Sequence, residues 1–266
     1  MTGERLIRPA GPRISRRKLL LGLGAGAAAA SLSGCDAGSP AALNVLEKAE
    51  AFTKAVQRPL LAPRTALAVE YPPGAITPTF KPNGSIDPDD PDYVAARQSG
   101  FADWKLEFGG LVERPMKLTL ADLRSLPSRT QITRHDCVEG WSCIGQWKGV
   151  QLSALAAAAG LKPQARYLAF FCADTLEQTL DNTGRYYETI DLIDVFHPQT
   201  ILAYEMNFAP LKVEHGAPLR LRVERQLGYK MAKYVMRIEA IDGFSGIARG
   251  RGGFWEDRGY EWYAGI

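Results

Sequence analysis

Three short apolar runs constrain the fold of this chain more than any other feature. Residues 167–172, 219–223 and 234–241 are rich in apolar and β-branched side chains and are bounded by turn or charge signals, which predicts buried or half-buried strands. The predicted helices are short: a capping box begins one at 119–122, and another spans 152–159, with Ser153 as N-cap and Gly160 as its stop. Long parallel strand–helix alternation is not evident. We therefore predict an α+β fold, mostly mixed β-sheet with short helices.

The first 35 residues have the layout of an export signal. A basic stretch at 5–18 precedes an apolar stretch at 19–32, and the box Leu-Ser-Gly-Cys ends at Cys35. Arg16 and Arg17 resemble the twin-arginine signal that exports folded proteins, and the Cys35 box resembles a lipoprotein cleavage site. We predict that residues 1–35 are a twin-arginine-type signal with a lipobox, and that the protein is periplasmic or extracytoplasmic and membrane-anchored through lipidated Cys35. A non-lipidated exported protein and an uncleaved helical anchor are the alternatives.

The rest of the chain divides into an arm and one domain. Residues 36–91, where prolines recur from Pro59 onward, are predicted to be a tether and wrapping arm, and 92–266 to be a single domain. The whole chain carries a net charge of +3, but residues 1–34 contain six basic side chains and one acidic one, so the remainder lies near −2. The apparent basicity belongs to the signal, and we predict no nucleic-acid partner.

The loop at 135–143 concentrates the candidate chemistry. With Cys35 assigned to the anchor, three cysteines remain (Cys137, Cys143 and Cys172), an odd number in a compartment where spare thiols are oxidised. A thiol beside a possible imidazolium at His135 is expected to have a lowered pKa, which favours the thiolate that metals bind. The residues allow three interpretations of Cys137 and Cys143: Cys137 binds a metal, the two form a C-x5-C dithiol, or both are inert buried thiols. A zinc site would need four ligands, and this loop supplies only three.

The motif at 135–142, His-Asp-Cys-Val-Glu-Gly-Trp-Ser, resembles the cysteine loop of the sulfite-oxidase family of molybdopterin enzymes, especially its bacterial periplasmic branch. The likeness continues in the family's order through the segments 165–172, 197–200, 215–220 and 228–234. It implies a sulfite-oxidase-like molybdopterin-binding fold for residues 92–266. It also implies a molybdenum-molybdopterin cofactor (Mo-MPT) whose metal is bound by Cys137. Cys143 falls at a position that need not be Cys in the family, which favours a structural role.

The resemblance implies a set of pterin contacts as well. The pterin ends in a phosphate, which calls for cations and backbone amides, because charge-assisted hydrogen bonds are the strong ones. Cys172 stands where the resembled branch has a cofactor-contacting Thr. The segment 77–84 stands where the family covers the pterin with Tyr and Asn, so that contact stays open. Besides Cys137, the predicted cofactor-binding residues are Cys172, His215, Arg220, Lys230, Met231, Ala232 and Lys233.

Three further features receive predictions. Glu139 lies two residues past the predicted metal ligand, where a carboxyl can relay protons, so we predict a catalytic role; a simple ion pair with an Arg is the alternative. His197, before a proline, is predicted to be a hydrogen-bonded turn histidine rather than a ligand. The aromatic tail at 254–263 is predicted to cap the core, with the rim of the active-site mouth as the alternative.

The function implied by the resemblance is exported molybdenum-cofactor chemistry: two-electron oxygen-atom transfer on a small S-oxide, N-oxide or sulfite-like substrate, in either direction. The sequence has no haem-attachment motif C-x-x-C-H, so we predict a membrane or periplasmic haem-type electron-transfer partner. Two rivals remain. One is a non-catalytic exported lipoprotein that binds a ligand or partner on the same scaffold, and the other is thiol–disulfide exchange through Cys137 and Cys143.

Overall fold

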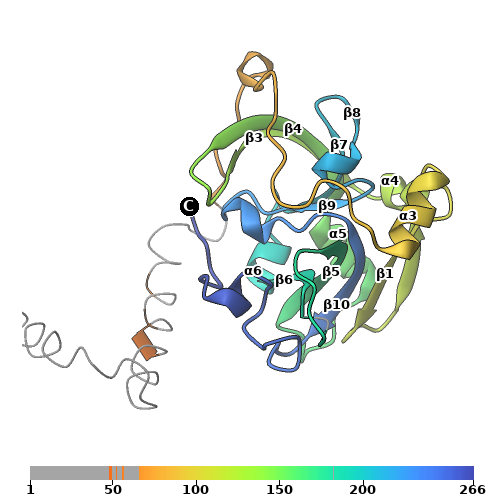
Figure 1. Cartoon of the computed structure of the whole chain (residues 1–266), viewed down its shortest axis with the longest axis vertical. Helices are drawn as coiled ribbons and strands as arrows, with labels where there is room; N and C mark the ends of the chain where they lie inside the picture. Colours follow the sequence, from red (N-terminus) through yellow and green to blue (C-terminus); the bar gives the residue numbers. More distant parts are fainter. Residues whose placement is uncertain (1–47, 50–51, 53–55, 57–65, 182) are drawn as a thin grey trace, which may run out of the picture. The chain divides into compact units, whose positions relative to one another are not determined.

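Two five-stranded β-sheets carry the fold of the described part of the chain, which comprises residues 48–49, 52, 56, 66–181 and 183–266 of a computed structural model (Figure 1). The few described residues up to Val56 are helical and belong to a separate unit, Met1–Val56; the others belong to the compact unit Gln57–Ile266. The predicted signal, including Cys35, and nearly half of the predicted tether at 36–91 lie outside the described residues. None of the helices in the described ranges has the length and apolarity to cross a membrane.

The first sheet has the order β2-β1-β10-β5-β6. β1 and β10 pair in parallel, while the other neighbours are antiparallel. Its inner face is buried because apolar side chains alternate along the strands, as Leu106 and Phe108 do in β1. The bounds are β1 (Lys105–Gly110), β2 (Met116–Thr119), β5 (Tyr167–Thr175), β6 (Arg185–Asp191) and β10 (Val235–Ile241).

The second sheet has the order β3-β4-β7-β8, and β9 also pairs with β7. Its longest strands, β3 and β4, form one antiparallel hairpin that pairs from Ser128 opposite Val150 to Asp136 opposite Ser142. The hairpin is drawn in light green in Figure 1. The bounds are β3 (Ser128–Asp136), β4 (Ser142–Gln151), β7 (Ile201–Met206), β8 (Ala209–Pro210) and β9 (Arg220–Arg222).

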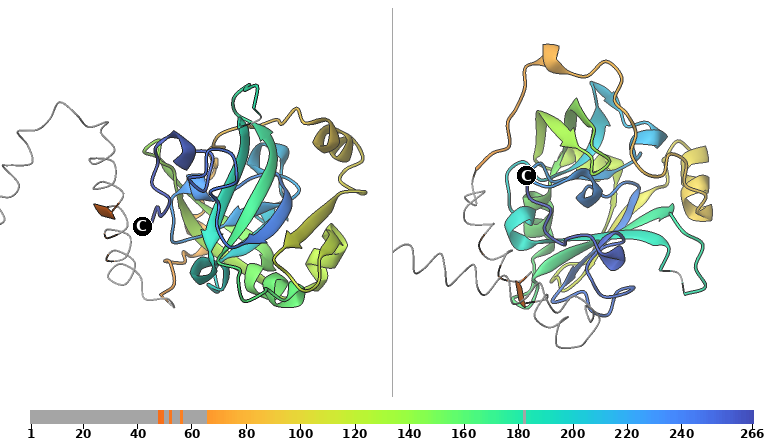
Figure 2. Two further views of the ribbon diagram at one scale, coloured as in Figure 1. Left: turned by 90° about the horizontal axis from the view of Figure 1, so that it is seen from below. Right: turned by 60° about the vertical axis from the view of Figure 1, so that its left-hand side comes forward.

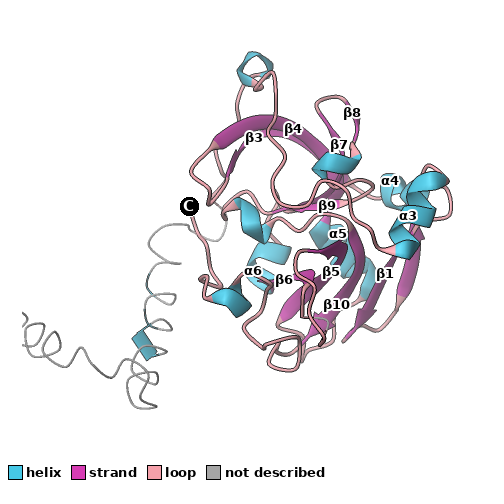
Figure 3. Cartoon of the chain, viewed as in Figure 1, coloured by secondary structure: helices cyan, strands magenta, loops and turns pink. Residues whose placement is uncertain are grey.

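The helices are short, as predicted, and lie around the sheets (Figure 3). The capping box at Thr119 and Asp122 begins α4, and Gly160 ends α5 in the left-handed conformation that glycine favours. The predicted N-cap Ser153 is wrong: Gln151 takes that position, because β4 runs directly into the helix. The α+β prediction is confirmed. The helices are α3 (Pro91–Gln98), α4 (Leu120–Ser125), α5 (Leu152–Ala159) and α6 (Leu192–Val195).

Residues 66–90, here called the arm, lie along the second sheet. The Tyr71 amide donates to Ile132 O (2.9 Å) on β3, and the Thr77 amide donates to Ile144 O (3.0 Å) on β4. Figure 2 shows the arm, coloured orange to gold, passing over this hairpin. The arm also buries Phe80 in a small apolar cluster around Trp147. It therefore covers the end of the β3–β4 hairpin, where the cysteine loop lies.

Candidate active site

Cys137 lies in the turn that joins β3 to β4. Its amide donates to Trp141 O (2.9 Å), and the Gly140 amide donates to Cys137 O (3.0 Å). Gly140 has a φ of 84°, a conformation that suits glycine and strains other residues. The sequence His-Asp-Cys-Val-Glu-Gly-Trp-Ser thus folds as a strand end, a tight turn and a new strand. As a result, the Cys137 thiol is held at a rigid hairpin tip.

His135 does not activate Cys137 in the predicted way. The imidazole is fully buried, and its Nδ1 accepts a hydrogen bond from Arg222 Nη1 (2.9 Å). Burial, followed by the charge of Arg222, holds the pKa of His135 well below its ordinary value, so the ring is neutral. Burial also raises the pKa of the Cys137 thiol. The predicted imidazolium and the lowered thiol pKa are therefore wrong for the metal-free chain.

A cavity opens beside the Cys137 turn, and six separate parts of the chain line it. The arm contributes Asn83, Gly84 and Ser85, and the hairpin tip contributes Cys137, Val138 and Glu139. We call it the Cys137 cavity. Its remaining lining residues, from β5, β6 and the segments around 230 and 255, are Asp174, Leu176, Tyr186, Tyr229, Met231, Lys233 and Trp255.

Three basic side chains predicted from the sequence meet next to this cavity: His215, Arg220 and Lys233. Arg220 Nη1 donates to His215 O (3.0 Å), and Lys233 Nζ donates to Glu214 O (3.1 Å). Gly216 is packed between them, since a Cβ there would lie 3.0 Å from Lys233 Cβ and 3.3 Å from Arg220 Cβ. Burial, followed by the charge of Arg220, lowers the pKa of Lys233 to about 7. Burial, followed by the charge of Arg220, also lowers the pKa of His215 to about 4, so Arg220 and Lys233 are the sources of positive charge in this cluster.

Several polar atoms of this cluster are buried without a hydrogen-bond partner among the described residues. They are Nε and Nη2 of Arg220, Nδ1 of His215 and Oδ1 of Asn83. A buried donor left unpaired costs about 1–3 kcal/mol, and more when it is charged. Burial lowers the pKa of Arg220 to about 9, which reflects the same unfavourable environment. An anionic group with acceptor oxygens would satisfy the Arg220 nitrogens and a protonated His215 Nδ1, so these two residues fit the phosphate end of a pterin cofactor, whereas Asn83 Oδ1 would need a donor.

The structure gives Lys230 a different setting from Lys233. Its ammonium is fully buried and donates to Glu188 and to Glu256 Oε1 (2.5 Å), under the ring of Trp262. Burial and the neighbouring Glu256 raise the pKa of Glu188 well above its ordinary value. Lys230 does not line the Cys137 cavity. This geometry makes it an internal ion-pair residue, and its predicted contact with the pterin has no support here.

The other predicted cofactor residues also include some that line the Cys137 cavity and some that do not. Met231 lines the cavity, and its sulfur lies 3.3 Å from His135 Nδ1. Ala232 lies in the core, where its carbonyl accepts the Leu221 amide (2.8 Å). Cys172 is a buried thiol of β5, and burial raises its pKa well above the ordinary value. Of these three residues, only Met231 faces the Cys137 cavity.

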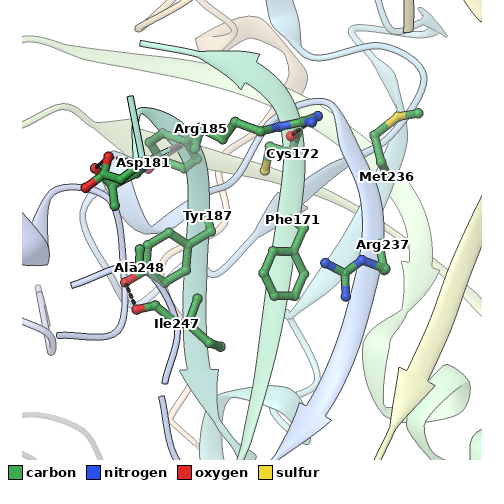
Figure 4. A pocket seen from close by; sticks show the side chains of 11 residues that line it. Phe171, Cys172, Asp181, Arg185, Tyr187, Met236, Arg237, Ile247 and Ala248 are labelled. Carbon is green, nitrogen blue, oxygen red and sulfur yellow. Dashed lines mark hydrogen bonds between the residues drawn. The ribbon is translucent and has the colours of Figure 1, made fainter. Parts of the chain in front are cut away.

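Cys172 instead borders a second cavity of about 350 Å³ (Figure 4). Phe171 lies between Arg237 and Tyr187 on its wall, and the Arg237 guanidinium stacks on the Phe171 ring at 3.9 Å. Tyr187 donates to Ile247 O (3.4 Å) across one side. Tyr186 lines both cavities. This second space is therefore separated from the Cys137 cavity by the end of β5 and by Tyr186.

Glu139 lies at the rim of the Cys137 cavity. Its carboxylate accepts from Trp141 Nε1 (2.8 Å) and lies 3.6 Å from Lys81 Nζ, so its ionic partner is a lysine of the arm rather than an arginine. The Lys81 ammonium also lies 5.0 Å from the centre of the Trp141 ring. These three side chains join the arm to the hairpin tip at the mouth of the cavity.

Neither a reactive Cys137–Cys143 dithiol nor a metal site with several protein ligands finds support in the structure. Cys137 and Cys143 are both free, and Cys143 is buried in the apolar cluster around Trp147. Within the described ranges, no three His, Cys, Asp or Glu side chains are grouped to hold a metal ion, so Cys137 would be a lone protein ligand. His197 accepts from the Gln199 amide (3.3 Å) and lies 3.0 Å from Ala66 O, which fits a turn histidine.

Several residues of the site were not predicted from the sequence. The arm residues Lys81 and Ser85 and the buried Asp174 were not singled out, although a carboxyl directly after an apolar strand was a usable signal. Arg222 was also missed. Its guanidinium lies 4.3 Å from the Trp147 ring centre and is held by Glu224 (2.6 Å). These residues come together only through tertiary contacts.

Comparisons with known proteins agree with this geometry. The family model "Oxidoreductase molybdopterin binding domain" matches residues 93–245. The chain is 36% identical, over 80% of its length and 73% of the relative's, to a protein of Azospira oryzae named as protein-methionine-sulfoxide reductase subunit YedZ1.

More distant relatives and a solved structure share part of the chain. Catalytic subunits MsrP of protein-methionine-sulfoxide reductase from Campylobacter jejuni and Gluconobacter oxydans are 32% and 35% identical over 54% and 52% of the chain. The chain spans only about half the length of these two relatives (51% and 47%). The crystal structure of the sulfane dehydrogenase SoxCD from Paracoccus pantotrophus is 28% identical, with a TM-score of 0.46 over 53% of this chain and 38% of that one. From the matched family model and the Azospira relative, the chain belongs to the molybdopterin-binding oxidoreductases of the sulfite-oxidase family and is an enzyme of that family.

Proposed function

We propose that this protein is an exported enzyme that binds Mo-MPT through Cys137 and reduces a small S-oxide by two-electron oxygen-atom transfer. The observation that carries the proposal is that Cys137 and Lys233 line one cavity, while Arg220 and His215, packed beside Lys233, have buried nitrogens without a partner among the described residues. The named methionine-sulfoxide reductases among the relatives favour an S-oxide over an N-oxide or sulfite. We propose a membrane or periplasmic haem-type protein as the electron donor.

The side chains have distinct roles in this proposal. The Cys137 sulfur binds the metal, and Arg220, His215 and Lys233 bind the phosphate end of the pterin. When bound, the cofactor supplies the two-electron redox chemistry. Phe80 excludes water from one side, since its ring packs against those of His135 (5.8 Å), His215 (5.7 Å) and Trp147 (5.4 Å). Lys81, Glu139 and Trp141 orient the substrate at the mouth.

Export and anchoring remain part of the same proposal. The twin-arginine-type signal at 1–35 and the lipobox cysteine Cys35 support a membrane-anchored periplasmic enzyme, because that route carries proteins that have already folded around a cofactor. Cell fractionation should find the active protein in the membrane fraction, facing the periplasm. Cytoplasmic active protein would contradict export.

The proposal is tested on full-length protein produced in cells that make the cofactor. Elemental analysis should find one molybdenum per chain, and a reduced dye should be oxidised when methionine sulfoxide is added. An N-oxide, and sulfite with an oxidised dye, serve as the competing substrates. Protein that is correctly matured but contains no molybdenum would favour the non-catalytic binder, and turnover of sulfite alone would reverse the proposed direction.

Replacing Arg220 should separate cofactor binding from folding. In Arg220→Met the molybdenum and pterin content should fall by roughly tenfold or more, the lower range for losing a group that supports a metal site. The melting temperature of the cofactor-free chain should not fall, because losing the bond from Nη1 to His215 O is offset by removing the buried Nε and Nη2, which lack partners among the described residues. Arg249→Met, at an exposed position, is the matched control. Normal cofactor content in Arg220→Met would argue against the assigned phosphate site.

A further inference from the structure

Asp174 is a buried carboxyl that faces the Cys137 cavity and has no assigned role. It is 3% exposed and lies near the end of β5, in the stretch between Phe171 and Thr175 where the register with β6 shifts. Its Oδ1 has no hydrogen-bond partner in the described part of the chain. Such a carboxyl is costly to bury unless it binds a proton or meets a donor in the cavity.

The groups around Asp174 set its affinity for a proton. Lys233 and Arg185 are the cations that act on it, and Lys233 lines the same cavity. Lys233 makes no ion pair with Asp174, because its ammonium donates to the backbone at Ser85 and Glu214. The other titratable groups that interact with Asp174 electrostatically are Cys172, Tyr93, Tyr186 and Tyr234.

Asp174 and Glu139 are the two carboxyl groups of the cavity, and they differ in environment. Glu139 is 57% exposed and already accepts from Trp141 while lying next to Lys81. Asp174 is buried, and burial raises its pKa to about 7 against the opposing effect of Lys233. A carboxyl whose pKa lies near the working pH can both hold and release a proton. The buried carboxyl is therefore the better proton donor of the two.

We propose that Asp174 delivers to this cavity a proton that oxygen removal consumes. The inference rests on the proposed function. Converting an S-oxide to a thioether and water takes two electrons and two protons. The reduced enzyme supplies the two electrons, and the proposed haem-type donor then reduces the enzyme again. One proton leaves the Asp174 carboxyl as an O–H bond forms on the oxygen that departs as water, and the second comes from solvent. The carboxylate then regains its proton from solvent.

The first test compares the kcat–pH profiles of molybdenum-loaded wild type, Asp174→Asn, Asp174→Glu and the exposed control Asp242→Asn. Wild type and the control should lose kcat as pH rises through about 7. Asp174→Asn should lose about 100-fold in kcat, the lower range for general acid catalysis, with a smaller change in KM and no inflection near neutral pH. Asp174→Glu should recover the inflection.

The second test needs no activity and uses the cofactor-free full-length chain. A raised folded-state pKa means that the native state binds the proton more tightly, so this group lowers stability as pH rises from about 4 to about 7. Asp174→Asn lacks this penalty. As pH rises from about 4 to about 7, the melting temperature of the variant should therefore rise relative to that of wild type. Asp242→Asn should run parallel to wild type.

The outcomes separate the two proposals. Active wild type with an unchanged profile in Asp174→Asn would overturn the role of Asp174, as would parallel melting curves. Loss of molybdenum from Asp174→Asn would also overturn it, because the carboxyl would then serve to hold the cofactor. Wild type that turns over none of the substrates would instead defeat the proposed function, and the melting curves would still decide whether Asp174 binds a proton near neutral pH.

Discussion

Cys137→Ser should abolish oxygen-atom transfer, while Cys143→Ser should leave most of it intact. The Cys137 thiol is at the hairpin tip and lines the cavity, whereas Cys143 is buried in the apolar cluster around Trp147. A group that only supports a metal ligand contributes about 10–100-fold, so losing the ligand itself should cost more than about 100-fold in activity. Steady-state reduction of methionine sulfoxide, normalised to molybdenum content, measures the effect.

The paired variants also decide between molybdenum chemistry and thiol–disulfide exchange. A dithiol mechanism needs both sulfurs, so it predicts that Cys143→Ser is as inactive as Cys137→Ser. Melting temperatures provide the control for folding, because Cys143 is only 7% exposed and its replacement places a hydroxyl in an apolar cluster. Equal loss of activity in two equally folded variants would exclude Cys137 as the sole reactive thiol.

Lys230→Met should destabilise the protein by about 3–5 kcal/mol, since removing one partner of a buried ion pair leaves an uncompensated charge. That is a large share of the roughly 5–15 kcal/mol that stabilises a typical domain. The ammonium joins Glu188 on β6 to Glu256 in the carboxyl-terminal segment, and all three side chains are at most 1% exposed. Urea unfolding of the cofactor-free chain measures the change.

Further variants test whether the buried ion pairs of Lys230 account for its effect on stability. Burial and the neighbouring Glu256 raise the pKa of Glu188, so Glu188→Gln, which keeps a neutral oxygen acceptor, should cost less than Lys230→Met. Lys212→Met, at a side chain that is 77% exposed, is the matched control and should change stability by no more than about 0.5 kcal/mol. If Lys230→Met instead unfolds normally but loses molybdenum, Lys230 contacts the cofactor as predicted from the sequence.

The sequence was sufficient for features that depend on neighbouring residues. Apolar runs with turn signals identified the strands that contain Phe170, Leu221 and Ile238, and the capping box at Thr119 located a helix start. The cysteine loop was recognisable from the residue types and order of eight successive positions. That it forms the tip of a β3–β4 hairpin, with Gly140 in the turn, was seen only in the structure.

Tertiary structure decided which of the chemically similar side chains face the site. Lys230 and Lys233 lie three positions apart in one segment, yet Lys230 meets two carboxylates from distant strands and loops, while Lys233 faces the cavity. The pKa of His135 is lowered first by burial and then by Arg222, which lies 87 residues away and donates to the ring. Burial and charge at one position depend on groups that only folding brings near, so a sequence pattern can name a titratable residue but not its protonation state.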